Sequence, residues 1–195
     1  MIKRIGVLAL QGAFREHRLA LEQFRCEVVE VRKTSDLEGV HGLILPGGES
    51  TTIGKLLQVD GLGDKIKEMA AVNLPIFGTC AGMILLSKRI QNSDQYNLGL
   101  MDMTAERNAF GRQIASFEAD LNVPALGSQP VRAVFIRAPF IREIAPNVGI
   151  LAEYEGKIVF VRQGNMLASA FHPELTGDRR VHQYFVEIVE ENWGK

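Results

Sequence analysis

The sequence predicts an α/β fold, an open three-layer sandwich with a mostly parallel central sheet. Short apolar runs rich in Val, Ile and Leu recur along the first half of the chain, and segments with a helical period separate them. Strands that alternate with helices pair in parallel, and the crossover helices cover both faces of the sheet. The apolar runs are nearly continuous, which is typical of strands buried on both faces.

The first half of the chain contains both kinds of expected element. We expect strands at four apolar runs, residues 5–10, 27–31, 42–45 and 75–78. We expect helices at three segments of helical period, residues 15–24, 62–71 and 81–89.

The second half of the chain is richer in strand-like segments. Strands are expected at 131–136, 157–163 and 166–170, with a helix at 181–190. An antiparallel excursion or a sheet edge is therefore expected there. A chain of 195 residues with 46% hydrophobic content can bury one sizeable core, and it has no internal repeat or Pro/Ser-rich linker. We expect residues 1–195 to form a single domain.

Composition argues against several classes of partner. The net charge of −1 gives no electrostatic attraction to nucleic acid or to an anionic membrane. No stretch approaches the roughly 18 apolar residues of a membrane span. Two cysteines, Cys26 and Cys80, argue against a disulfide scaffold and suit a reducing cytosol, so a cytoplasmic protein is expected. No Cys/His cluster has metal-ligand spacing, and neither a metal nor a cofactor is expected.

Unusual residues follow three of the expected strands and one later segment. Functional residues of open parallel sheets collect at the carboxyl ends of the strands. Here these ends carry Gln11 and Gly12, then residues 46–50 (PGGES), 79–82 (TCAG) and 172–174 (HPE). We therefore expect the functional site among these segments.

Residues 78–82, Gly-Thr-Cys-Ala-Gly, have the form of a nucleophile elbow with sulfur in place of a serine hydroxyl. The tight turn projects Cys80 above the sheet edge, and its small neighbours let strand and helix approach closely. A helix N-terminus favours the thiolate, and the Ala81 backbone N–H points to whatever the sulfur attacks. The pattern by itself also fits a packed cysteine.

His172 is the expected base for Cys80. Glu174 follows it by two positions, and residues i and i+2 of an extended backbone point to the same side, so the carboxylate can hydrogen-bond the imidazole. Pro173 disfavours helix at His172. The other histidines are expected to be solvated or structurally satisfied: His17, His41 and His182.

Acyl transfer also requires an oxyanion hole. Ala81 offers one backbone N–H, and Gly47, in the Gly47–Gly48 turn, offers a second because glycine permits unusual dihedrals. The Gly47–Gly48 peptide can rotate at low steric cost. We expect it to switch between an orientation whose N–H points at the oxyanion and one whose carbonyl points there and repels it. Pro-Gly-Gly is equally typical of a plain turn. The turn is no P-loop, because the sequence has no G-x-x-x-x-G-K-[ST] pattern.

Together these residues resemble a known family. "LPGGES", "GTCAGM" and "FHPE", in that order, are similar to class I (triad) glutamine amidotransferases. Six blocks between Ile5 and Arg180 resemble the glutaminase subunits of pyridoxal 5′-phosphate synthase: IGVLALQGAFREH, LPGGESTT, GTCAGMILL, ERNAFGRQ, FIRAP and FHPELTGDRR. The resemblance covers nearly the whole chain, and the catalytic blocks show no departure from the pattern.

The resemblance implies hydrolysis of L-glutamine to L-glutamate and ammonia without a cofactor or metal. Cys80 would form a γ-glutamyl thioester, His172 would move the protons, and Glu174 would hold the imidazole tautomer. The family's glutamine site maps onto Gly48, Glu49, Ser50, Arg107, Ile136 and Arg137. The ammonia would pass to a separate (β/α)8-barrel synthase subunit, which uses it with a pentose phosphate and a triose phosphate to make pyridoxal 5′-phosphate.

Two other functions are compatible with the elbow. A cysteine hydrolase of the same fold would act on a different acyl group, although the "ERNAFGRQ" and "FIRAP" blocks argue against it. A redox sensor without enzymatic activity would use oxidation of Cys80, with His172 and Glu174 incidental. Release of glutamate from glutamine distinguishes the glutaminase from both.

Overall fold

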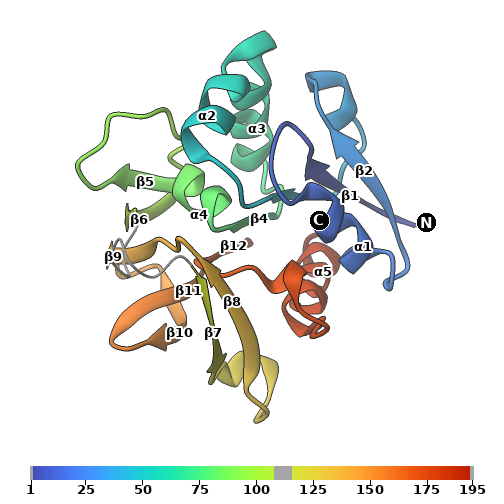
Figure 1. Cartoon of the computed structure of the whole chain (residues 1–195). Helices are drawn as coiled ribbons and strands as arrows, with labels where there is room; N and C mark the ends of the chain where they lie inside the picture. The colour runs from blue at the N-terminus through green and yellow to red at the C-terminus, as the bar shows by residue number, and fades with distance from the viewer. Residues whose placement is uncertain (1, 108–115, 194–195) are drawn as a thin grey trace.

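A ten-stranded sheet forms the centre of the computed structural model, which describes residues 2–107 and 116–193 (Figure 1). Its strands are β1 (Lys3–Leu8), β2 (Cys26–Val31), β3 (Gly42–Leu45), β4 (Ile76–Thr79), β5 (Ser87–Ile90), β6 (Met101–Glu106), β9 (Phe140–Ile144), β10 (Gly149–Tyr154), β11 (Lys157–Gln163) and β12 (Met166–Ser169). A second sheet pairs β7 (Ser116–Leu121) with β8 (Val131–Ile136).

The large sheet has a parallel half and a largely antiparallel half. Its order is β2-β1-β3-β4-β12-β11-β9-β6-β5, and β10 pairs with β11. The five strands from β2 to β12 are parallel to their neighbours, whereas β11 runs antiparallel to β12, β9 and β10. The predicted fold class is confirmed, as is the change of pairing in the second half of the chain.

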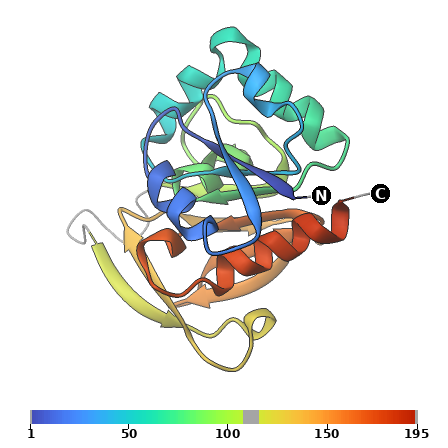
Figure 2. The same ribbon diagram turned by 90° about the vertical axis from the view of Figure 1, so that its right-hand side faces the viewer.

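Helices cover both faces of the sheet (Figure 2). They are α1 (Phe14–Leu21), α2 (Ser50–Leu57), α3 (Leu62–Ala71), α4 (Ala81–Leu86) and α5 (Arg180–Asn192), with short 3-10 turns at η1 (Thr34–Leu37), η2 (Val59–Gly61), η3 (Pro124–Leu126) and η4 (Pro173–Leu175). In the strand order of the sheet, the chain moves toward one edge from β1 to β2 and toward the other edge from β3 to β4. Right-handed crossovers therefore place α1 on one face and α2 and α3 on the other.

The core lies between the sheet and these helices. Every residue of β3 and of β4 is buried, as expected for near-continuous apolar strands. On α5, Val181, Phe185 and Val189 recur at helical spacing and are fully buried, and the Phe185 ring lies 5.7 Å from that of Phe77. None of the helices in the described residues is long and apolar enough to cross a membrane.

The expected helix at 81–89 is partly wrong. The helix α4 ends at Leu86, and residues 87–90 form the edge strand β5. The Ser87 hydroxyl donates a hydrogen bond to the Ile84 carbonyl at 2.6 Å, and Ile90 pairs with Ala105 of β6. Pairing with β6 therefore overrides the helical period of this segment. The helix α2 and the strands β6, β7, β9 and β10 were not expected from the sequence.

The close approach of α4 to β3 yields a stability prediction. A methyl group at Gly82 would lie 1.9 Å from the Leu45 carbonyl oxygen, which belongs to backbone that cannot move aside cheaply. Gly82→Ala is expected to lower the free energy of unfolding by about 1–3 kcal/mol, measured by chemical denaturation. Gly177→Ala is the control, because a methyl group there meets nothing within 4 Å. Equal stability of the two variants would contradict this packing.

Candidate active site

The expected site segments meet at the carboxyl ends of β3, β4 and β12. In the parallel registers, Gly78 is opposite Leu45, and Thr79 is opposite Ser169. The next backbone N–H, that of Cys80, donates to the Ser169 carbonyl at 2.7 Å. The strand end that precedes His172 is therefore tied directly to Cys80.

Cys80 occupies the strained position of a nucleophile elbow. Its φ of 49° and ψ of −102° lie in a region that side-chain-bearing residues rarely adopt. The two flanking residues, Gly78 and Gly82, pack so closely that a larger side chain would clash: a methyl group at Gly78 would lie 2.5 Å from the Gly82 carbonyl carbon. The sulfur is thereby held at the start of α4 rather than inside the strand.

His172 and Glu174 form a buried hydrogen-bonded pair. His172 Nδ1 lies 2.7 Å from Glu174 Oε1, and the imidazole and the Cβ of Cys80 both lie next to Gly47. Burial disfavours the imidazolium, but the contacts with Cys80 and Glu174 outweigh it and raise the pKa of His172 to about 10. Burial alone would raise the pKa of Glu174, whereas His17 and His172 hold it below its usual value. Glu174 is therefore an ionised acceptor for the imidazole.

The Gly47 turn packs against this pair. A methyl group at Gly47 would lie 2.3 Å from His172 Cε1, so only glycine fits there. The Gly47 N–H donates to Thr79 Oγ1 at 3.1 Å, and the Gly47 carbonyl accepts from the Ala13 N–H at 3.0 Å. The Gly47 N–H, which we expected to face an oxyanion, is engaged by Thr79 in this structure.

Several of the expected glutamine-site residues are brought together by Gln95, which sequence reasoning missed. Arg107 donates to Gln95 Oε1 at 2.9 Å, and the Ser50 hydroxyl donates to the same oxygen at 3.3 Å. Arg107 also lies 3.8 Å from the Glu49 carboxylate. The Glu49 N–H in turn donates to Gln11 Oε1 at 2.8 Å. Nothing in the sequence pattern around Gln95 marks it as part of this cluster.

The remaining expected residues lie beside Cys80 or next to that cluster. Ala81 begins α4 directly after Cys80. The Ile136 carbonyl oxygen, at the end of β8, lies 4.0 Å from Cys80 Sγ, and Arg137 follows it with a positive φ of 44°. Gly48 packs on the first strand's loop, where a methyl group would lie 2.5 Å from Gln11 Oε1. Residues 108–113 of the "ERNAFGRQ" block lie outside the described residues.

Two histidines lie behind the site, fully buried. His17 contacts Thr79, Glu174 and His182. A sequence signal for this burial exists: His17 shares a helical face with the apolar Ala20 and Leu21 of α1. The alternative that these two histidines are solvated is wrong. Both ring nitrogens of His17 have hydrogen-bond partners, whereas His182 Nδ1 has none among the described residues.

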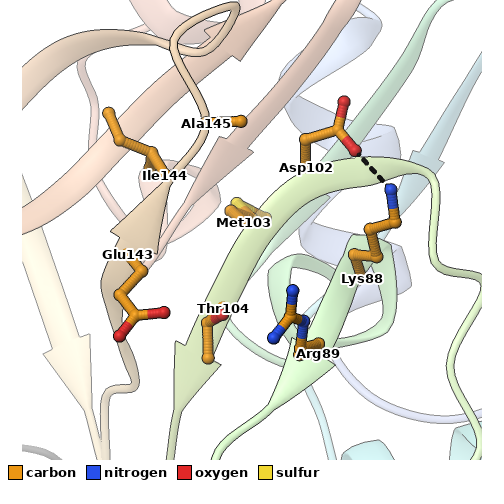
Figure 3. A pocket seen from close by; sticks show the side chains of 8 residues that line it. All are labelled: Lys88, Arg89, Asp102, Met103, Thr104, Glu143, Ile144 and Ala145. Atoms are coloured by element: carbon orange, nitrogen blue, oxygen red, sulfur yellow. Dashed lines mark hydrogen bonds and ion pairs between the residues drawn. The ribbon is translucent and has the colours of Figure 1, made fainter.

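A separate cavity of about 260 Å³ lies between β5, β6 and β9 and shares none of the residues above (Figure 3). Its Asp102 carboxylate pairs with Lys88 at 2.8 Å and also accepts from Asn147 and Gln163, which together lower the pKa of Asp102 to about 2. Asp102, on β6, thereby links the strand β5 through Lys88 and the strand β11 through Gln163. Across residues 2–107 and 116–193, no group of three or more His, Cys, Asp or Glu side chains is placed to hold a metal ion.

Comparisons with known proteins agree with this geometry. The SNO glutamine amidotransferase family profile matches residues 7–191. "Pyridoxal 5′-phosphate synthase subunit PdxT" of Moorella thermoacetica is 58% identical over 186 residues, which are 95% of this chain and 99% of that protein. The protein of the same name from Carboxydothermus hydrogenoformans is 56% identical, with 95% and 97% covered.

A solved structure described as "Crystal structure of glutamine amidotransferase" superposes with a TM-score of 0.91 at 50% identity, covering 95% of this chain and 98% of that one. Both the sequence match and the structural match extend over nearly the full length of the chains compared. The chain therefore belongs to the SNO glutamine amidotransferase family.

Proposed function

We propose that this chain is the glutaminase subunit of a pyridoxal 5′-phosphate synthase, and that it hydrolyses L-glutamine to L-glutamate and ammonia through Cys80, His172 and Glu174. The observation that carries the proposal is the buried His172–Glu174 hydrogen bond next to a cysteine that is held on a nucleophile elbow. The similarity to proteins named as subunits of that synthase supports the assignment of the substrate and the pathway.

The first half-reaction forms a thioester. Cys80 gives its thiol proton to His172, and the sulfur attacks the side-chain amide carbon of glutamine, so that the carbonyl electron pair moves onto oxygen. The raised pKa of His172 favours this proton transfer. As the tetrahedral intermediate collapses, the C–N bond breaks, and His172 returns the proton to the departing nitrogen. Ammonia leaves, and a γ-glutamyl thioester remains on Cys80.

The second half-reaction uses the same groups in reverse. His172 takes a proton from water, and the water oxygen attacks the thioester carbon. The C–S bond then breaks to release glutamate, and His172 returns the proton to the departing sulfur, which regenerates the Cys80 thiol. Glu174 holds the Nδ1–H tautomer throughout, which leaves the other ring nitrogen facing Cys80. One glutamine and one water thus yield one glutamate and one ammonia.

Two backbone N–H groups are proposed to bind the oxyanion. Ala81 supplies one of them. Because Thr79 engages the Gly47 N–H, the second donor is the Gly48 N–H of the same turn. The Gly47 carbonyl is held by the Ala13 N–H, so the Gly47–Gly48 peptide has a defined orientation that a bound partner could change.

Charge complementarity indicates which side chains bind the α-ammonium and the α-carboxylate of glutamine. The glutamine α-ammonium pairs with a carboxylate, for which Glu49 is placed, and its α-carboxylate pairs with the guanidinium of Arg107 or Arg137. Glu49 and Arg107 already lie 3.8 Å apart, so both could contact one amino acid. The two cysteines carry free thiols, which is consistent with the cytoplasmic location that we propose.

The triad yields the first functional prediction. Cys80→Ala is expected to abolish glutamate release, and His172→Ala to reduce it nearly to background. Glu174→Gln is expected to lose less, because it orients the base without transferring the proton. Glutamate is measured at saturating glutamine with excess synthase subunit. Wild-type turnover by Cys80→Ala would contradict the mechanism.

Dependence on the partner is the second prediction. The isolated chain is expected to release glutamate about 10²–10³ times more slowly than the chain with excess synthase subunit, which is the effect of one missing oxyanion donor. Glutamate release is measured for both at saturating glutamine. An equal rate in the two samples would rule out the switch and leave the triad untouched.

A further inference from the structure

His17 connects the catalytic carboxylate to the strand end that carries Cys80. His17 Nε2 lies 3.0 Å from Thr79 Oγ1 and 3.3 Å from Glu174 Oε2, and His17 Nδ1 lies 3.0 Å from His182 Nε2. The side chains of both histidines are completely buried. Apolar side chains would fill this space without the cost of burying polar atoms, so packing alone does not account for the arrangement.

The surroundings of His17 determine where its proton lies. Burial lowers the pKa of both His17 and His182, so each ring is neutral and has one N–H. Glu174 is ionised and can only accept hydrogen bonds. A lone pair on His17 Nε2 would repel Glu174 Oε2 at 3.3 Å, so the proton is on Nε2. His17 Nδ1 then accepts from the His182 Nε2–H.

The rest of the network agrees with this tautomer. It leaves His182 Nδ1 as an acceptor, and this atom has no hydrogen-bond partner among the described residues. With the opposite tautomer it would be a buried, unpaired N–H, which is costly. Thr79 Oγ1 accepts from both the Gly47 N–H and the His17 Nε2–H, so both of its lone pairs are used.

The two oxygens of Glu174 have different neighbours. Oε1 faces His172 Nδ1, while Oε2 has no aligned hydrogen bond among the described residues and has His17 Nε2 beside it. The His17 Nε2–H is aligned on Thr79 Oγ1 and also places its positive end beside Glu174 Oε2, an electrostatic contact that favours this rotation of the carboxylate. The same N–H contacts the hydroxyl of Thr79, which holds the Gly47 turn.

We propose that His17 is a positioning residue for glutamine hydrolysis: its Nε2–H holds Glu174 and Thr79 in their working geometry, and His182 fixes the tautomer that makes this possible. The proposal rests on the proposed function of Cys80, His172 and Glu174. It assigns a role in turnover to a side chain that takes no part in the bond changes.

A pair of amides tests the role of the Nε2–H. The glutamine Nε2 is the same number of bonds from Cα as the histidine Nε2, whereas the asparagine Oδ1 matches the histidine Nδ1 and can accept from the His182 Nε2–H. His17→Gln keeps a donor for Glu174, and His17→Asn keeps only the contact with His182. His17→Leu removes both. His41→Leu is the control, because His41 bonds the Arg4 N–H at the opposite end of β3.

The variants are compared in glutamate release with excess synthase subunit. We expect His17→Leu and His17→Asn to lower kcat by about 10- to 100-fold, the usual effect of losing a group that orients a reacting one, with KM changed less than threefold because His17 is not among the proposed glutamine-binding residues. His17→Gln is expected to retain most of the wild-type kcat. His41→Leu is expected to match wild type.

The pH profile separates positioning from simple packing. Glu174, His172 and Glu16 are the charged groups that act on His17, and Arg179 acts on His182. A neutral His17 still presents the positive end of its Nε2–H to Glu174 Oε2, so its loss raises the pKa of Glu174, and the carboxylate becomes protonated at higher pH. In the plot of kcat against pH, the fall of kcat on the acid side is therefore expected to occur at higher pH in His17→Asn and at the wild-type pH in His17→Gln.

Each result has a defined meaning. Equal kcat values for His17→Asn and His17→Gln, with the acid-side fall of kcat at the wild-type pH in both, would overturn the proposal whether or not His17→Leu folds, since thermal denaturation reports folding independently. Wild-type kcat in a folded His17→Leu would also overturn it. An inactive wild-type chain in the presence of the synthase subunit would instead contradict the proposed function itself.

Discussion

The parallel pairing of β4 with β12 is the constraint on which the site depends. Cys80 and His172 are far apart in the sequence, and no interaction between neighbouring residues in the sequence brings them together. The register that places Thr79 opposite Ser169, together with the 2.7 Å hydrogen bond from the Cys80 N–H to the Ser169 carbonyl, brings them together. A slip of one residue in this register would turn alternate side chains to the other face and separate the two.

Close backbone contacts then set the details around that pairing. Gly82 packs against β3, Gly47 packs against the imidazole of His172, and Gly12 packs against the Gly47 carbonyl. Each contact leaves no room for a methyl group, so the three loops position one another. The strained backbone of Cys80 is held from both sides, by its N–H bond to the Ser169 carbonyl and by the close contact of Gly78 with Gly82.

Much of this arrangement could be predicted from the sequence, because apolar runs report burial and short motifs report turns. The strand at 42–45 and the helix at 62–71 have the predicted bounds, whereas the helix at 81–89 is cut short by pairing of 87–90 with β6. Such pairing, like the convergence of Gln95 with Arg107 or of His17 with Glu174, joins distant segments. Local sequence patterns carry little information about contacts of this kind.

The central claim is that Cys80 carries the γ-glutamyl group during turnover. It is tested most directly by mixing the complex with glutamine, quenching it in acid within a turnover, and locating any adduct by peptide mass spectrometry. A glutamyl thioester is predicted on the peptide that contains Cys80, and none on Cys26, whose sulfur donates to the Leu21 carbonyl away from the site. Glutamate release without any adduct on Cys80, or an adduct on Cys26 instead, would contradict the account.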